Sequence, residues 1–331
     1  MAAGLRQRSS AALPTVYRFL VHRFASMIAT VVTVSIAIFL MVRLLPGNII
    51  DIMFAGDSTA TPEAKAAAAH QLGIDGSYFS QYWRWVKGIF EGDMGRSLLS
   101  QRPITTIFSS ALPITIELIV LGLLIAVVIG VPLGAISAVR RNSASDYAAR
   151  LGGLFGISIP NFWLATLLLV FSSRVFHWVP PLQYVSIFSD PWTNIQEFFM
   201  PAIAISVFTL AIVMRMVRAT MLEVLNLDYV RTARAKGVPR RRVLSRHALR
   251  NALIPVVTVV GFEVGVLIGG AAVVEIVFGL PGIGYTLLNA IFQRDYPVIQ
   301  NATLLIAVVF VAANTLVDLV YGVLDPRLSL S

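Results

Sequence analysis

The chain has 331 residues, of which 57% are hydrophobic and 13% are charged. Ordinary soluble domains carry about 25% charged residues, so this composition excludes a soluble globular protein and indicates several membrane spans. The formal net charge is +9, but the basic residues gather in segments that a single topology places on one side of a membrane. Because these segments lack base-reading aromatic residues and an RNA-type motif, we expect no nucleic acid partner.

Sequence patterns for catalysis and metal binding are missing. The chain contains no cysteine, which excludes disulfides and thiolate metal sites, and its four histidines lie far apart. Glycine is never followed directly by lysine, so there is no Walker A loop, and neither H-E-x-x-H nor G-x-S-x-G occurs. We therefore expect a protein that is not an enzyme, with no catalytic residue, no metal and no bound cofactor.

The first span is expected at residues 24–45. Residues 1–23 contain four arginines and no acid, which predicts a cytoplasmic N-terminal segment. The apolar run from Phe24 to Val42 is about long enough to cross a hydrocarbon core of ~30 Å as a helix. A signal peptide would have a shorter apolar region and an A-x-A-like cleavage site. We therefore expect an uncleaved span.

Residues 46–112 form a long polar region of mixed charge, which we expect on the outside. Thr61-Pro62-Glu63 predicts the start of an alanine-rich helix closed by Gly73. A second short helix is expected from Gln81 to Phe90, and its aromatic residues suit a membrane interface. A docking site for an external protein and a packed cap over the spans are both open alternatives for this region.

Five further spans are expected, at residues 113–139, 147–172, 198–221, 251–278 and 298–324. Pro132 predicts a kink in the second span, and Gly156 and Pro160 predict irregular backbone in the third. Arg215 and Arg218 end the fourth span, where they can snorkel to the inner interface. The sequence thus predicts an all-α polytopic protein of six spans, both termini cytoplasmic, with one transmembrane domain at 24–331.

The loop at residues 222–250 is strongly basic and is expected in the cytoplasm. Asp228 predicts an N-cap, Tyr229 to Lys236 a short helix, and Gly237 a left-handed residue that closes it. Pro239 suits the first turn of a following helix. The arginines alone fit a solvated loop, whereas the small residues, Thr232, Ala233 and Ala235, fit a helix covered closely by another surface.

The fifth span carries two further candidate features. Gly261, Gly265 and Gly269 recur every fourth residue and allow close helix approach, either within the chain or with a second subunit. Glu263 lies near the middle of the span, where an ionisable residue is costly and therefore a functional candidate. It could line a passage and meet a cationic end of a substrate, or pair with a polar group of a neighbouring subunit.

An external turn is expected between the last two spans. Pro281, Gly282 and Gly284 supply turn residues, and Arg294-Asp295-Tyr296-Pro297 precedes the sixth span.

Three sequence patterns resemble the permease subunits of ABC importers, in the peptide and nickel branch and of its "B" type. They are YVRTARAKG with HALRNALIP in the basic loop, TPE…QYWRW…GDMGRS…P after the first span, and PGIG…RDYP before the last. Permeases of this family commonly carry Glu-Ala-Ala six to four residues before the loop glycine. Here Arg231, Thr232 and Ala233 occupy those places, so a salt bridge from that glutamate does not carry over.

The resemblance implies a type I ABC-importer permease fold in a bacterial plasma (inner) membrane. It implies a second permease, two ATPase subunits that use ATP and Mg²⁺, and an extracytoplasmic substrate-binding protein. Peptides are the commonest cargo of this branch; nickel, glutathione and other small solutes are alternatives. The coupling helix that docks on an ATPase would comprise Asp228, Tyr229, Arg231, Thr232, Ala233, Lys236 and Gly237.

An alternative of another class is an ion-coupled secondary transporter without an ATPase partner. It predicts paired acids within the membrane and an inverted repeat. Glu263 is the only central acid that the spans offer.

Overall fold

The computed structural model describes residues 3–44, 50, 54, 61–71 and 75–324, and the regular elements in these residues are helices. Gly73, expected to close the alanine-rich helix, lies outside them. In chain order the elements are α1 (Ala3–Leu44), α3 (Pro62–Gln71), α4 (Tyr78–Glu91), α5 (Ile104–Val139), α6 (Ala144–Ser158), α7 (Asn161–Phe176), α8 (Pro191–Val224), α9 (Asp228–Ala235), α10 (Arg240–Arg242), the π-helix η1 (Val243–Leu249), α11 (Arg250–Phe278), α12 (Ile283–Gln293) and α13 (Tyr296–Leu324).

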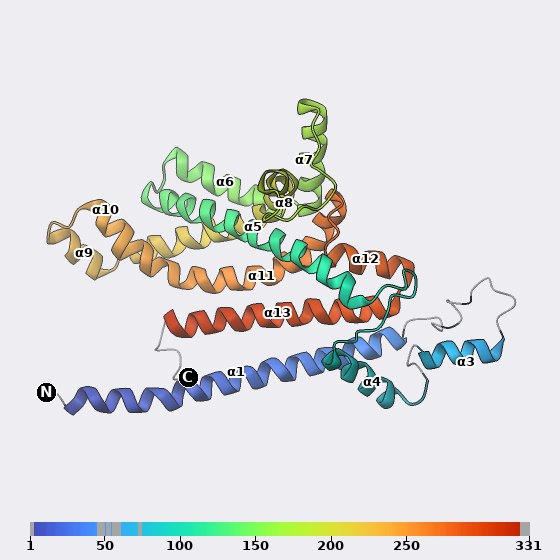
Figure 1. The fold of residues 1–331 in the computed structure, drawn as a ribbon. Helices are drawn as coiled ribbons and strands as arrows, with labels where there is room; N and C mark the ends of the chain where they lie inside the picture. Colours follow the sequence, from blue (N-terminus) through green and yellow to red (C-terminus); the bar gives the residue numbers. More distant parts are fainter. Residues whose placement is uncertain (1–2, 45–49, 51–53, 55–60, 72–74, 325–331) are drawn as a thin grey trace.

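The long helices α1, α5, α11 and α13 run lengthwise through the molecule (Figure 1). The short helices α9 and α10 lie at one end, where α1 begins and α13 ends, whereas α3, α4 and α12 lie toward the opposite end. The start of α1, the end of α13 and the basic loop therefore lie at the same end of the molecule.

Five helical segments of the described chain are long and apolar enough to cross a membrane, at Val21–Leu44, Ile104–Val139, Pro191–Val224, Arg240–Phe278 and Tyr296–Leu316. They correspond to five of the six predicted spans, and several extend beyond the predicted apolar limits. The structure therefore has six spans if α6 and α7 together form the remaining one.

The predicted third span is a bent pair rather than one helix. α6 and α7 meet at an angle of 103°. Ile159 ends α6 in an extended conformation, with φ −85° and ψ 120°. Pro160 causes this break, because it has no N–H to donate and its ring disfavours helical backbone at the preceding residue.

α5 and α8 pack closely against each other. A Cβ added at Gly134 of α5 would lie 2.5 Å from the Met214 carbonyl oxygen and 2.8 Å from the Val217 Cβ, and one at Gly130 would lie 3.0 Å from the Leu210 carbonyl oxygen. Small residues therefore let the two backbones approach closely. This row was not predicted, although Gly122, Ala126, Gly130 and Gly134 show the same four-residue spacing as the glycines of α11.

A buried ion pair joins α6 to α8. The Asp146 carboxylate is fully buried and accepts from Arg218 Nε at 2.7 Å and Nη2 at 3.0 Å, and from Ser137 Oγ of α5 at 2.6 Å. We expected Arg218 to snorkel to the interface, but the Asp146 carboxylate within the chain accepts from its Nε and Nη2 and holds it in place.

The external region packs onto the spans through α4. Tyr82 Oη lies 2.8 Å from Ser35 Oγ of α1, and Trp85 Nε1 donates to Asn301 Oδ1 of α13 at 3.0 Å. Both aromatic rings also contact Phe39. This part of the region is therefore a packed cap, whereas Trp83 stays exposed.

Candidate functional site

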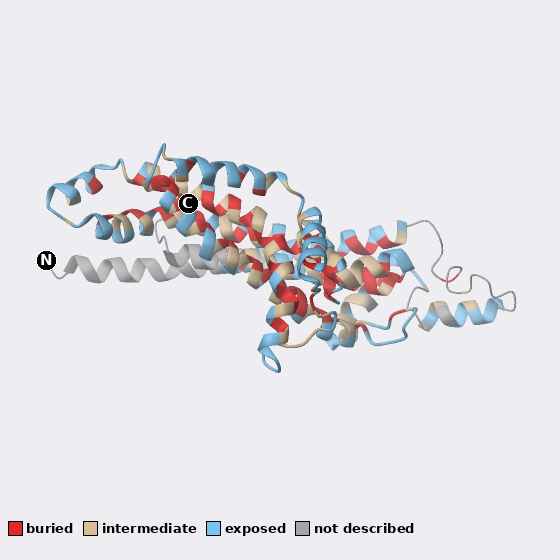
Figure 2. Ribbon diagram, turned by 90° about the horizontal axis from the view of Figure 1, so that it is seen from above, coloured by how far each residue is buried: buried red, intermediate tan, exposed pale blue. Residues whose placement is uncertain are grey.

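The basic loop (residues 222–250) folds into α9, α10 and η1 with an apolar side against the bundle. Val230, Val243 and Ala248 are buried with Val217 and Met221 of α8 in one cluster. The arginines remain exposed, and Figure 2 shows that exposed residues predominate at this end of the molecule. The segment is therefore neither a bare loop nor a closed core, but a packed platform with an outer basic surface.

α9 begins differently from the prediction. Leu227 is the N-cap, in an extended conformation and without a side-chain hydrogen bond, and Asp228 is already the first helical residue. The Asp228 carboxylate lies 3.5 Å from Arg231 Nη1, and both side chains are exposed. The prediction that Asp228 caps the helix is wrong, although its charge in the first turn still suits the helix dipole.

α9 ends as predicted, at a left-handed Gly237 with φ +77°. Gly237 N donates to the Arg234 carbonyl at 3.0 Å, and Val238 N donates to the Ala233 carbonyl at 3.2 Å. These two bonds form a Schellman motif, in which glycine takes the left-handed position without steric cost. Space does not require the glycine, because no described atom lies within 4 Å of a Cβ built there.

The chain then turns into the next helix through Pro239. Pro239 is the N-cap of α10, with ψ 138°, and so lies just before the first turn rather than within it. The π-helix η1 follows directly and continues into α11. The sequence did not indicate this π-helix. Short π-helical stretches often mark functional sites, so η1 adds to the candidate site.

Tyr229 ties α9 to the membrane helix that follows. Its hydroxyl donates to the His247 carbonyl of η1 at 3.2 Å and accepts from Asn251 Nδ2 of α11 at 2.8 Å. Val230, the next residue, is fully buried under the helix. Sequence reasoning missed Val230, His247 and Asn251 because nothing local to these positions indicates a contact 18 or 22 residues away.

The other predicted residues of α9 divide between its two faces. Ala233 is half-buried toward the bundle, and the Thr232 hydroxyl donates to the Asp228 carbonyl at 2.9 Å. The exposed residues of α9 and the turn that closes it are Asp228, Tyr229, Arg231, Thr232, Arg234, Ala235, Lys236 and Gly237. This face is basic, contains small residues, and is available to a partner.

Glu263 is buried within the described chain. Its carboxylate accepts from Thr209 Oγ1 of α8 at 2.9 Å. The glycine row of the same helix does not act as one ridge: Gly261 is buried, a Cβ at Gly265 would overlap the Phe310 ring of α13, and Gly269 is exposed with open space beside it. Within the chain, Gly265 is the member of the row that lies closely against another helix, at Phe310.

A second buried acid organises the external turn (residues 279–285). Glu275 accepts from Thr115 Oγ1 of α5 at 2.6 Å and from Tyr285 N at 2.8 Å. Thr115 Oγ1 also accepts from Ile283 N at 2.8 Å. Gly282 and Gly284 let the turn pack closely against α11, because a Cβ at Gly282 would overlap the Glu275 carboxylate and one at Gly284 would overlap Ala272.

The segment after α12 is also tied to the external region. Asp295 is buried and accepts from Ser97 Oγ at 2.5 Å and from Leu98 N at 3.2 Å. Among the residues described, no group of three or more His, Cys, Asp or Glu side chains is placed to hold a metal ion.

Comparison with known proteins now gives the family. The model of the inner membrane component of binding-protein-dependent transport systems matches residues 130–330, and the model of the N-terminal part of such membrane components matches residues 16–119. A putative peptide transport system permease protein of Brucella suis is 39% identical over 308 residues, covering 93% of this chain and 98% of the relative.

Two further relatives align almost end to end. The dipeptide transport system permease protein DppB of Escherichia coli K12 is 37% identical over 334 residues, and the di/tripeptide transport system permease protein DppB of Pseudomonas aeruginosa is 37% identical over 330 residues. In both cases the alignment covers 94% of this chain and 98% of the relative. The chain is thus a multi-pass membrane protein that belongs to the inner membrane components of binding-protein-dependent transport systems.

Proposed function

We propose that the chain is the permease subunit of an ATP-driven peptide importer in a bacterial plasma membrane, with both termini in the cytoplasm. Two separate ATPase subunits use ATP and Mg²⁺, and α9 docks on one of them. A second permease completes the passage, and an extracytoplasmic binding protein delivers the cargo. The family and the peptide-transport names of the aligned relatives support this proposal.

One observation carries the mechanism: α9 is fixed to the membrane helices on one face and free on the other. Val230 holds it against α8, and Tyr229 holds it to η1 and α11. A force on the exposed face is therefore transmitted to two spans rather than absorbed by a flexible loop. ATP-driven closure of an ATPase pair beneath the membrane would then move α8 and α11 together.

Peptides are the cargo that we propose for this transporter. Relatives named for peptide or dipeptide transport favour peptides over nickel, glutathione or another small solute. Uptake of a labelled dipeptide by the assembled transporter, competed with unlabelled dipeptide, glutathione and Ni²⁺ in turn, decides among them. Competition by Ni²⁺ alone would exclude the peptide proposal.

An ion-coupled transporter working without an ATPase receives less support. The family is named for dependence on a binding protein, and the central acid Glu263 bonds to Thr209 rather than to a second central acid.

Gly237→Val tests the coupling proposal. A β-branched residue in a left-handed position costs about 1–3 kcal/mol or more, so the variant should lose the end of α9. We expect uptake by the reconstituted transporter to fall at least tenfold and less ATPase to copurify, with an unchanged amount of permease in the membrane. Normal uptake would overturn the proposal.

Gly92→Val is the matched control. Gly92 ends α4 with φ +81°, and no described atom lies within 4 Å of a Cβ built there. The conformational cost is therefore similar, but the residue lies toward the opposite end of the molecule. ATPase copurification should be the same as in the unmodified transporter.

Glu263 is the residue that we propose for the passage itself. In the structure it is closed off by α8, so this role requires the Thr209 contact to open during transport. Glu263→Gln retains the size and the hydrogen bond but removes the charge. Reduced uptake of a cationic dipeptide relative to a neutral one is expected; equal transport of both at the unmodified rate would assign Glu263 to packing.

A further inference from the structure

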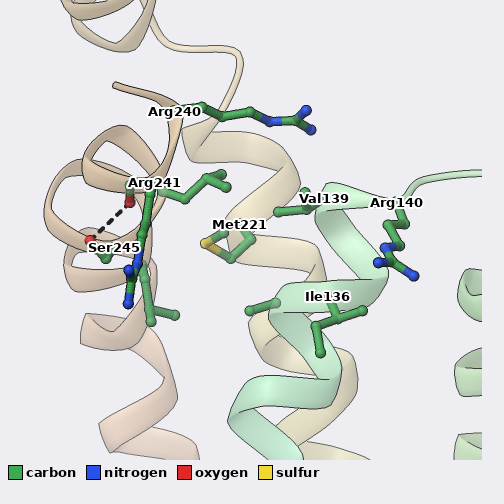
Figure 3. A pocket seen from close by; sticks show the side chains of 10 residues that line it. Ile136, Val139, Arg140, Met221, Arg240, Arg241 and Ser245 are labelled. Carbon is green, nitrogen blue, oxygen red and sulfur yellow. Dashed lines mark hydrogen bonds between the residues drawn. The ribbon is translucent and has the colours of Figure 1, made fainter. Parts of the chain in front are cut away.

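An apolar cavity of about 460 Å³ lies beside the basic loop, between α5, α8 and the α10–η1 segment. Figure 3 shows η1 on one side and α5 on the other, with Met221 of α8 between them. Its apolar walls are formed by Ala135, Ile136, Val139, Met221, Leu244 and Leu249. The remaining neutral residue, Ser245, donates its hydroxyl to the Arg241 carbonyl at 3.0 Å. The body of the cavity therefore has an apolar lining.

Three arginines complete the lining: Arg140, Arg240 and Arg241. The Arg240 side chain extends across the mouth of the cavity toward the end of α5 (Figure 3). In the part of the chain that the structure describes, none of the three makes an ion pair. Three unpaired cations beside an apolar chamber favour an occupant with one anionic end and one apolar end.

The position of the cavity also fits a membrane boundary. α5 ends at Val139, and Arg140 and Arg141 follow directly. Exposed apolar residues continue along α5 from the cavity wall toward the membrane centre, at Ile136, Leu133 and Ile129. These residues are spaced three and four apart and so share one helix face. An acyl chain that enters the cavity could follow this strip into the bilayer.

We propose that this cavity is a binding site for an anionic phospholipid. The phosphate lies against Arg240, with Arg241 and Arg140 as the other basic residues of the lining, and an acyl chain occupies the apolar chamber and the strip on α5. Basic pockets between membrane helices on the cytoplasmic side are suited to such headgroups. Because the chamber is lined by η1, which Tyr229 ties to α9, an occupied site would stiffen the platform of the coupling helix.

The test measures lipid binding directly. The full-length chain, purified in detergent, is titrated with dioleoyl phosphatidylglycerol or dioleoyl phosphatidylcholine, and the bound lipid is counted by native mass spectrometry. We expect clear preference for phosphatidylglycerol. Arg240→Gln with Arg241→Gln should weaken phosphatidylglycerol binding about tenfold or more, since each basic residue near a headgroup contributes on the order of 1 kcal/mol.

Arg246→Gln with Arg250→Gln is the matched control. It removes the same charge from the same segment, but neither residue lines the cavity, and both are exposed. Binding should change less than about twofold if the site is local. Equal losses in the two double variants would mean diffuse attraction to the basic surface and would overturn the proposal, as would equal binding of phosphatidylcholine. Helical circular dichroism checks that both variants fold.

Two further measurements distinguish a phospholipid from other occupants of the cavity. Millimolar inorganic phosphate should not displace phosphatidylglycerol; full displacement would mean an anion site without a role for the acyl chain. The assembled transporter should retain the bound phosphatidylglycerol. Its loss on assembly, while the isolated chain binds it, would assign the cavity to a protein contact and overturn the lipid proposal.

Discussion

The basic loop and the external turn both depend on glycine, but for different physical reasons. Gly237 is needed for its backbone conformation, with φ +77° and open space where a Cβ would be. Gly284 has no left-handed backbone, yet a Cβ there would overlap Ala272 of α11. Free space around the first glycine leaves a surface for a partner, whereas the crowding around the second locks α11 to α12. The two regions thus combine an open surface at the basic loop, where we propose that an ATPase docks, with a tightly packed turn at the opposite end.

The largest expected effect comes from filling the crowded turn. Gly284→Ala places a methyl group against backbone atoms of Ala272 that cannot rotate away, so we expect a loss of about 3 kcal/mol in stability, at the upper end for overpacked sites. Thermal unfolding of the purified chain in detergent measures it. Gly269→Ala is the control, because its Cβ would meet open space and alanine favours a helix by about 1 kcal/mol over glycine. A larger loss at Gly269 than at Gly284 would contradict the comparison.

The next effect comes from the buried polar network of the same turn. Thr115→Val removes one donor to Glu275, whose carboxylate still accepts from Tyr285 N, and leaves Ile283 N without its acceptor. A buried group left unpaired costs about 1–3 kcal/mol. Thr220→Val is a control of equal burial, since both threonines are 8% exposed. Thr220 bonds only to carbonyls of its own helix, so the Thr220→Val protein should unfold at nearly the same temperature as the unmodified one. If the two variants changed the unfolding temperature equally, the hydrogen bonds of Thr115 would not explain the rigidity of the turn.

Local chemistry explains what could be predicted from the sequence. The closure of α9 at Gly237 and the break near Pro160 depend on one residue's backbone preferences, and so both features were foreseeable. Five predicted spans correspond to long apolar helices of the described chain, and they followed from long apolar runs and arginine placement. The 103° bend, by contrast, is set by where α6 packs on α5 and α8 and where α7 packs on α8 and α11.

Tertiary contacts explain what could not be predicted. Gly282 and Gly284 were expected as turn residues, but their crowding comes from Glu275 and Ala272, which only the fold brings close. The Tyr229–Asn251 tie has the same origin. The N-cap expected at Asp228 failed although aspartate favours that position, because the chain enters helical geometry one residue earlier.

A smaller effect is expected at the basic loop. Tyr229→Phe removes two hydrogen bonds at a half-exposed site, each worth about 1 kcal/mol at most in net stability. Global unfolding should change little, but hydrogen exchange of the α9 amides should accelerate and uptake should fall. Asn251→Ala and the double variant complete a cycle. Strict additivity of the two exchange effects would show that the Tyr229–Asn251 bond does not hold α9.

The smallest effect is expected at Asp228, and Asp190 shows why. Asp190 is the N-cap of α8 and accepts from Trp192 N at 3.1 Å and Thr193 N at 3.2 Å, whereas Asp228 accepts no backbone N–H of its helix in the described structure. The Thr193 hydroxyl and these backbone donors hold the pKa of Asp190 below its usual range. A depressed folded pKa contributes stability above the unfolded pKa and loses it as pH falls, so the Asp190 contribution should disappear below about pH 4.

Asp190→Asn should therefore lower the unfolding temperature at pH 7 and reduce its loss on acidification, because asparagine keeps an acceptor but has no charge to titrate. Asp228→Asn should leave both the unfolding temperature and its pH dependence unchanged, since an exposed pair at 3.5 Å contributes little. If Asp228→Asn nevertheless reduced uptake, its carboxylate would act on the docked partner rather than on the helix. That outcome would sharpen the contrast between the two regions, because a residue with no effect on stability would then affect transport.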